Sequence, residues 1–216
     1  MSDDFWLRDN ATRRHVIGRL AALAAACGVS GGQTNARAQS ARAQSARGKK
    51  PPTRETPPDV ILGQGVQGLP PAVADIRAEI QAAVETGSIA ELRRAMDLNE
   101  LKPEFGAPAG VDGLDFLRSL SPDGTGAAVL ADLGRLIDAK WAAIPGGRDI
   151  ENNRMYVWPH FAEVALDKLS DDDRAALAAF AGAEAAKEMI AANRFRGWRL
   201  SIGADGVWHT FMRVGE

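Results

Sequence analysis

Cysteine and long apolar runs are almost absent from this chain of 216 residues. Its single cysteine, Cys27, lies near the N-terminus. A mature protein that has lost this region therefore has neither a disulfide nor a thiol nucleophile. The apolar run from Leu20 to Ala26 is only about seven residues long, whereas a membrane-spanning helix needs roughly 20. We expect no transmembrane anchor in the mature form.

Motifs for catalysis and cofactor binding are also scarce. No serine lies in the Gly-x-Ser-x-Gly turn of serine hydrolases. The stretch from Gly63 to Gly68 matches the Gly-x-Gly-x-x-Gly pattern of dinucleotide sites, but residues 69–71 read Leu-Pro-Pro where such a site needs the start of a helix. We interpret these glycines as a loop, and we expect no cofactor.

The N-terminus carries the clearest motif of the chain. Arg13 and Arg14 precede the short apolar run, and small-residue Ala-x-Ala sites end at Ala38 and at Ala43. Paired arginines in this position are typical of the twin-arginine signal, which carries folded proteins across a bacterial inner membrane. We therefore predict a signal peptide over residues 1–38, cleaved after Ala38 or alternatively after Ala43, and a periplasmic mature protein.

Cys27 leaves a different processing route open. The sequence from Leu23 to Cys27 is similar to a lipoprotein box whose leucine stands one position too far upstream. Lipidation of Cys27 would attach the mature protein to the membrane. A membrane-anchored lipoprotein is therefore the alternative to a free periplasmic protein.

The rest of the chain divides into a spacer and one domain. Residues 39–58 are rich in Arg, Lys and Pro and poor in large apolar residues, which predicts a disordered linker. Residues 59–216 are enough for a single globular domain with its own core. This domain has 24 Asp and Glu against 16 Lys and Arg, a net charge of −8. Such an acidic balance argues against nucleic acid as a partner.

Apolar residues recur with a helical period along most of the domain. The period predicts helices over residues 70–85, 88–96, 114–120, 126–142, 171–180 and 183–192. In the fourth of these segments, Leu133, Ile137 and Trp141 belong to one apolar stripe, which is typical of a helix with one buried face.

Strands are predicted only in the C-terminal third. Met155 to Trp158 is dense in aromatic and β-branched residues and predicts a short strand, while residues 198–202 and 207–212 predict a β-hairpin. The expected fold class is α+β, mainly α-helical, with this C-terminal antiparallel hairpin and one further short strand.

The hairpin turn decides which aromatic side chain is buried. We favour a three-residue turn ending at Gly206, which predicts Trp208 and Thr210 on the same face as Ile202. A two-residue turn would put His209 and Phe211 on that face instead, because a slip of one residue turns every side chain over. Burial of tryptophan is less costly than burial of histidine.

Aromatic residues and histidines coincide at two places in the domain. Tyr156, Trp158 and His160 follow one another closely, and Trp208 stands next to His209. If the predicted strand pairs with the hairpin, these five side chains form one binding cleft. Buried packing is the plainer explanation for each of them.

Two chemical alternatives use the same region. His160 and Glu163 are three residues apart, a spacing that suits metal ligation within one helical turn, and His209 is the third candidate ligand. Glu163 and Asp167 lie near Trp158, and paired carboxylates beside an aromatic platform suit carbohydrate hydrolysis. A metal-assisted or carbohydrate-active hydrolase is therefore the alternative function.

The same segments carry a family resemblance. Tyr156-Val157-Trp158-Pro159-x-Phe161 and Ile202-Gly203-x-Asp205-Gly206-x-Trp208-His209-x-Phe211 are similar to motifs in a group of uncharacterised exported alphaproteobacterial proteins. The resemblance runs from about Leu69 to the C-terminus. It implies an exported protein and no particular activity.

The sequence favours a binding role over catalysis. The leading hypothesis is a non-enzymatic module of the cell envelope, which binds an envelope protein or a small ligand through the aromatic cleft. Its only support is the coincidence of aromatic residues with the two histidines of the domain.

Overall fold

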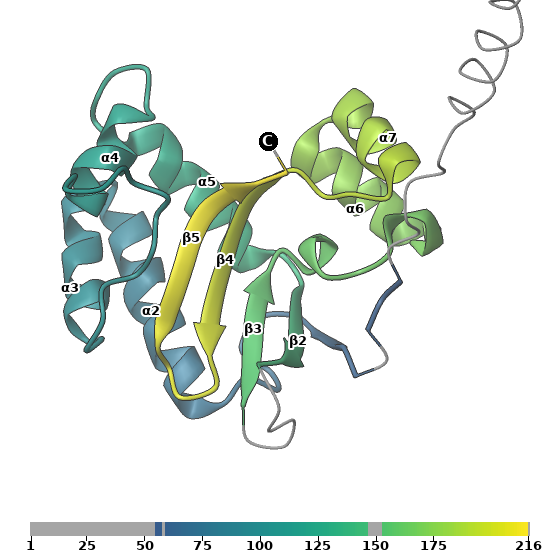
Figure 1. The fold of residues 1–216 in the computed structure, drawn as a ribbon, viewed down its shortest axis with the longest axis horizontal. Coiled ribbons are helices and arrows are strands. Elements are labelled where there is room, and N and C mark those ends of the chain that lie inside the picture. The colour runs from purple at the N-terminus through teal and green to yellow at the C-terminus, as the bar shows by residue number, and fades with distance from the viewer. Residues whose placement is uncertain (1–54, 58, 147–152, 216) are drawn as a thin grey trace, which may run out of the picture. The chain divides into compact units, whose positions relative to one another are not determined.

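The computed structural model describes residues 55–57, 59–146 and 153–215. They form an α+β fold with six α-helices and a five-stranded antiparallel sheet (Figure 1). The predicted signal peptide, its cleavage sites and most of the linker lie outside the described residues. No helix of the described part combines the length and the apolar character that crossing a membrane requires.

The sheet follows the order of the chain. Its strands are β1 (Ile61–Gly63), β2 (Trp141–Pro145), β3 (Arg154–Trp158), β4 (Gly197–Gly203) and β5 (Trp208–Val214), and each pairs with the next in antiparallel fashion. The predicted strand and the predicted hairpin are therefore both present as β3, β4 and β5. The sheet has two strands more than the sequence predicted.

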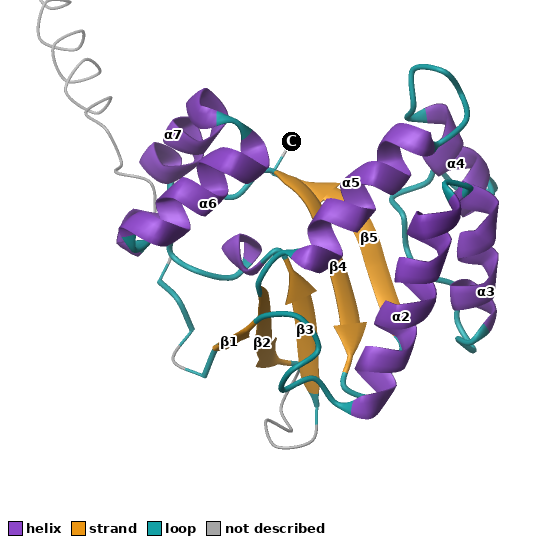
Figure 2. Ribbon diagram, turned by 180° about the vertical axis from the view of Figure 1, so that it is seen from behind, coloured by secondary structure: helices purple, strands orange, loops and turns teal. Residues whose placement is uncertain are grey.

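The helices agree closely with the apolar period. They are α2 (Pro71–Thr86), α3 (Leu92–Asp97), α4 (Gly113–Ser119), α5 (Ala127–Asp138), α6 (Asp171–Ala181) and α7 (Ala183–Ala192), with short 3-10 turns η1 (Ile89–Glu91), η2 (His160–Ala162) and η3 (Leu166–Lys168). α2 and α5 lie across one face of the sheet, whereas α6 and α7 pair with each other beyond it (Figure 2).

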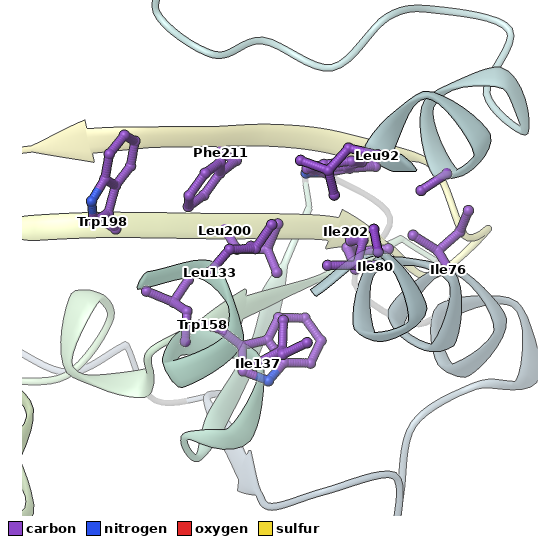
Figure 3. Close-up of a cluster of buried hydrophobic side chains, with 14 of the residues drawn as sticks. Ile76, Ile80, Leu92, Leu133, Ile137, Trp158, Trp198, Leu200, Ile202 and Phe211 are labelled. Carbon is purple, nitrogen blue, oxygen red and sulfur yellow. The ribbon is translucent and has the colours of Figure 1, made fainter. Parts of the chain in front are cut away.

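Two clusters of apolar side chains hold these layers together. The larger lies between the sheet and helices α2 to α5, and Leu133, Ile137, Leu200 and Phe211 are examples of its fully buried members (Figure 3). The smaller joins β3 and η2 to α6 and α7. The two clusters meet at β3, because Trp158 belongs to the larger cluster and Val157 to the smaller. The turn η2, which follows β3, packs in the smaller cluster.

The predicted helix over 126–142 was wrong at its C-terminal end. α5 ends at Asp138, and Trp141 begins strand β2 instead of continuing the helical stripe. Trp141 stands four residues after Ile137, so it matches the helical period by coincidence, and the alanines that follow it are good helix formers. The tertiary context overrides this preference because Ala142 and Ala143 are buried between two neighbouring strands.

The favoured hairpin turn is confirmed. Gly206 has a φ of 86°, its N–H donates to the Gly203 carbonyl at 2.9 Å, and the Gly203 N–H donates to the Val207 carbonyl at 2.8 Å. This is a three-residue turn with glycine in the left-handed position. Trp208 is consequently paired with Ile202 and fully buried, as expected.

Thr210 does not share the core face, contrary to the prediction. The register shifts beside Ser201, so that Thr210 pairs with Ser201 and Phe211 pairs with Leu200. His209 is the extra residue of this bulge. The bulge brings both Trp208 and Phe211 into the core, which neither uniform register allowed.

Gly63 is the last residue of β1, Gly65 and Gly68 lie in the loop that follows it, and all three are close to Trp141. A Cβ on Gly63 would overlap the Trp141 ring, and Gly68 lies against the same ring. The indole N–H of Trp141 donates to the Gly65 carbonyl at 3.1 Å. The motif thus wraps a buried tryptophan, and its glycines permit the close approach.

Candidate functional site

The predicted aromatic cleft is not formed. The side chains of Trp158 and Trp208 have no exposed surface, and Tyr156 is only 7% exposed. All three pack in the larger core cluster, where the Trp208 ring meets Phe105 edge-on at 5.5 Å between ring centroids. The apolar surface of all three rings is buried inside the fold, so these side chains do not line a cleft.

The two histidines of the domain lie in different surroundings. His160, in η2, is 1% exposed, whereas His209 is an exposed residue of β5. Glu163 forms an ion pair with Arg199, with 2.8 Å between Oε1 and Nη2. Within residues 55–57, 59–146 and 153–215 no three His, Cys, Asp or Glu side chains form a group suited to a metal ion. The predicted set of His160, Glu163 and His209 is therefore not assembled.

A pocket that the sequence did not reveal lies beside His160. Its volume is about 440 Å³, and we call it the His160 pocket. It is lined by Gln64, Arg135, Asp138, Ala139, Lys140, His160, Phe161, Ala176, Ala179 and Phe180. These residues come from the C-terminal end of α5, from η2 and from one side of α6, with Gln64 contributed by the glycine loop.

Local structure holds the His160 imidazole in the wall of this pocket. The backbone N–H of His160 donates to the Lys140 carbonyl at 2.8 Å, which ties η2 to the segment after α5. The ring lies 4.0 Å from the Phe161 ring, centroid to centroid. Nε2 is 3.6 Å from Oδ1 of Asp173, too far for a hydrogen bond. Neither ring nitrogen has a hydrogen-bond partner among the described residues.

Asp173 is held by two other groups. Lys140 Nζ donates to its Oδ1 at 2.9 Å, and the Ser170 hydroxyl donates to its Oδ2 at 2.9 Å. These contacts, led by the one with Lys140, lower the pKa of the Asp173 carboxyl. Ser170 also caps α6 by accepting a hydrogen bond from the Asp173 N–H at 3.1 Å. The carboxylate is thus ionised and fixed in place.

The His160 imidazole is neutral at neutral pH. Burial lowers its pKa below the ordinary 6.5, and the nearby ammonium of Lys140 acts in the same direction. The Asp173 carboxylate opposes this shift without reversing it. The wall of the pocket therefore holds an uncharged imidazole next to the Lys140–Asp173 ion pair, whose two charges balance.

This arrangement suits binding better than covalent catalysis. Phenylalanine and alanine side chains make up half of the described lining, and no serine, threonine or cysteine is among them. These residues therefore supply no hydroxyl or thiol nucleophile, and the lining carboxylate, Asp138, is paired with Arg77. A mostly apolar pocket with a few placed polar groups is typical of a small-molecule site.

Sequence reasoning named His160 but missed its neighbours. Asp173 and Lys140 were predicted only as residues of the helices over 171–180 and 126–142. Asp173 lies near His160 because α6 packs against η2, and Lys140 lies near it through the hydrogen bond from the His160 N–H to the Lys140 carbonyl. No motif or spacing indicates either relation.

Comparisons of the chain with family models, with curated proteins and with solved structures found no match. The resemblance to uncharacterised exported proteins stays a prediction.

Proposed function

We propose that this protein is exported to the periplasm and there binds a small, mostly apolar ligand in the His160 pocket, without catalysing a reaction. One observation carries the binding proposal: a buried imidazole with no hydrogen-bond partner stands in the wall of an apolar pocket. Such a group is costly to leave unpaired, so it calls for an explanation.

The dimensions of the pocket support this role. A volume of about 440 Å³ falls within the range of ordinary small-molecule sites, roughly 300 to 1,000 Å³. The exposed residues Ala176 and Ala179 of α6 lie at its opening to solvent, while Phe161 is buried. A ligand would therefore enter past small side chains and bury its apolar part against aromatic rings.

Export is proposed from Arg13 and Arg14 and the cleavage sites that follow them. The intact mass of the protein from the envelope of its native host tests this part. A mass that begins at Gln39 or Gln44 supports a free periplasmic protein. A lipidated Cys27 would indicate a membrane-anchored form, and an uncut chain in the cytoplasm would overturn the export proposal.

A fluorescence titration tests the binding part. The neutral apolar dye N-phenyl-1-naphthylamine, added to the purified full-length protein, should bind at one saturable site with a rise in emission. Ala179→Trp should abolish this signal, because a large ring at the pocket opening occupies the space of the ligand.

Ala175→Trp is the matched control. Ala175 is an exposed alanine of the same helix and does not line the His160 pocket, so the same substitution there costs the same helix propensity and leaves the pocket open. Absence of saturable dye binding, or equal binding by the Ala179 and Ala175 variants, would overturn the proposal.

A further inference from the structure

We infer that the ligand of the His160 pocket is a neutral molecule with an apolar body and one hydroxyl group, of the class of alkyl phenols, and not a carboxylate or a phosphate. This inference rests on the proposed binding function. It follows from the apolar lining, from the balance of charge around the pocket and from the hydrogen-bonding needs of His160.

The apolar body is indicated by the rings and methyl groups of the lining. Phe161 and Phe180 contribute aromatic surface, and Ala139, Ala176 and Ala179 contribute small side chains between them. A sugar or a nucleotide would leave most of its polar groups unpaired against such a surface. An aromatic or aliphatic body gains from the same contact.

The charges around the pocket cancel one another. Lys140 is paired with Asp173. Arg135 is paired with Asp132, which also accepts a hydrogen bond from the Trp198 indole at 2.9 Å. Asp138 is paired with Arg77 at 3.4 Å.

Each charged residue of the described lining therefore has a partner of opposite charge, and no cation of that lining is left over to attract an anionic ligand. A carboxylate would have to compete with a carboxylate that the protein already supplies. A neutral ligand meets no such competitor.

The hydroxyl group is indicated by the imidazole. A neutral imidazole has one N–H donor and one acceptor nitrogen, and here both nitrogens are buried without a hydrogen-bond partner. A hydroxyl group donates and accepts, so it can pair with the ring nitrogen that it reaches in either tautomer of His160. A carboxylate only accepts, and a hydrocarbon does neither.

Access to the imidazole depends on Lys140. Its side chain is 43% exposed, compared with 17% for Asp173 and 1% for His160, so it is the member of the cluster that has room to move. A ligand that reaches the ring therefore requires a shift of the Lys140 side chain, while the hydrogen bond from Ser170 holds Asp173.

Three probes of one shape separate the chemical classes. The purified full-length protein is titrated at neutral pH with 4-propylphenol, propylbenzene and 4-propylbenzoate, each in competition with N-phenyl-1-naphthylamine. We expect 4-propylphenol to bind about tenfold more tightly than propylbenzene, the effect of one hydrogen bond to a buried group. We expect 4-propylbenzoate to bind no more tightly than propylbenzene.

Variants assign the preference to the imidazole. His160→Phe keeps a ring of similar size and should bind the phenol and the hydrocarbon equally, whereas His209→Phe, at an exposed position, should keep the tenfold preference. Ala179→Trp should abolish binding of all three probes, which places them in the pocket even if His160→Phe does not fold.

The outcomes distinguish the ligand class from the function. Equal affinity for the three probes, tighter binding of the benzoate, or a phenol preference that survives His160→Phe would overturn the ligand class and leave binding intact. Failure of all three probes and of the dye would overturn the proposed function as well.

Discussion

Substitution of Trp208 tests the hairpin register on which the core depends. Trp208 has no exposed surface, it pairs with Ile202, and its indole N–H donates to the Thr210 carbonyl at 3.1 Å. Its neighbour His209 is exposed on the bulge. Two adjacent residues should therefore respond very differently to the same substitution.

The expected size of the difference follows from burial. Trp208→Ala removes a fully buried indole and its edge-on contact with Phe105, which should lower the free energy of unfolding by about 3 to 5 kcal/mol. His209→Ala should change it by no more than about 0.5 kcal/mol. For a domain of this size, the first change lowers Tm by roughly 6 to 20 °C.

Urea unfolding followed by far-ultraviolet circular dichroism measures both variants against the unmodified protein. A double-mutant cycle with Phe105→Leu should add a coupling of about 0.5 to 1.5 kcal/mol between the two rings. If His209→Ala costs as much as Trp208→Ala, or if Trp208→Ala is nearly neutral, the register and the burial argument are both wrong.

Further predictions concern the glycine loop, pH and export. Gly63→Ala should lower the free energy of unfolding by about 1 to 3 kcal/mol in urea titrations, because the new methyl group overlaps the Trp141 ring. The unfolded chain binds more protons than the folded one at His160, because burial lowers the pKa of this group below 6.5. The free energy of unfolding should therefore fall as pH is lowered through about 6.5, and His160→Phe should reduce this slope in titrations at several pH values. Replacement of Arg13 and Arg14 by lysine should leave the uncut precursor in the cytoplasm, as cell fractionation and intact mass would show.

Most helices were predictable because their stability comes from one apolar face. α2, for example, buries Val73, Ile76 and Ile80 at helical spacing and ends at Gly87, whose φ is 70°. β1 and β2 had no comparable signal. β1 is three residues long, and the alanines of β2 are strand residues only because two neighbouring strands bury them.

The candidate site was predictable only in part, because composition does not distinguish a buried ring from an exposed one. Trp158 and Trp208 were correctly predicted as strand residues and belong to β3 and β5, yet they are buried in the core instead of lining a cleft. His160, which the sequence singled out, lies in the wall of a pocket, but its relation to Asp173 requires the packing of α6 on η2. That relation is tertiary, and no local pattern encodes it.

The cost of His160 to the fold is itself an argument for function. If the pocket were only a defect of packing, an apolar ring at this position would serve the fold better, because an unpaired buried polar group costs about 1 to 3 kcal/mol. His160→Phe should therefore raise the free energy of unfolding of the ligand-free protein by roughly that amount at neutral pH, while it lowers the affinity for a phenol. Gain of stability together with loss of binding is the trade-off expected of a residue kept for its ligand. If His160→Phe instead lowers both the free energy of unfolding and the affinity for a phenol, the imidazole supports the fold. An unpaired imidazole would then no longer be evidence for a binding site at His160.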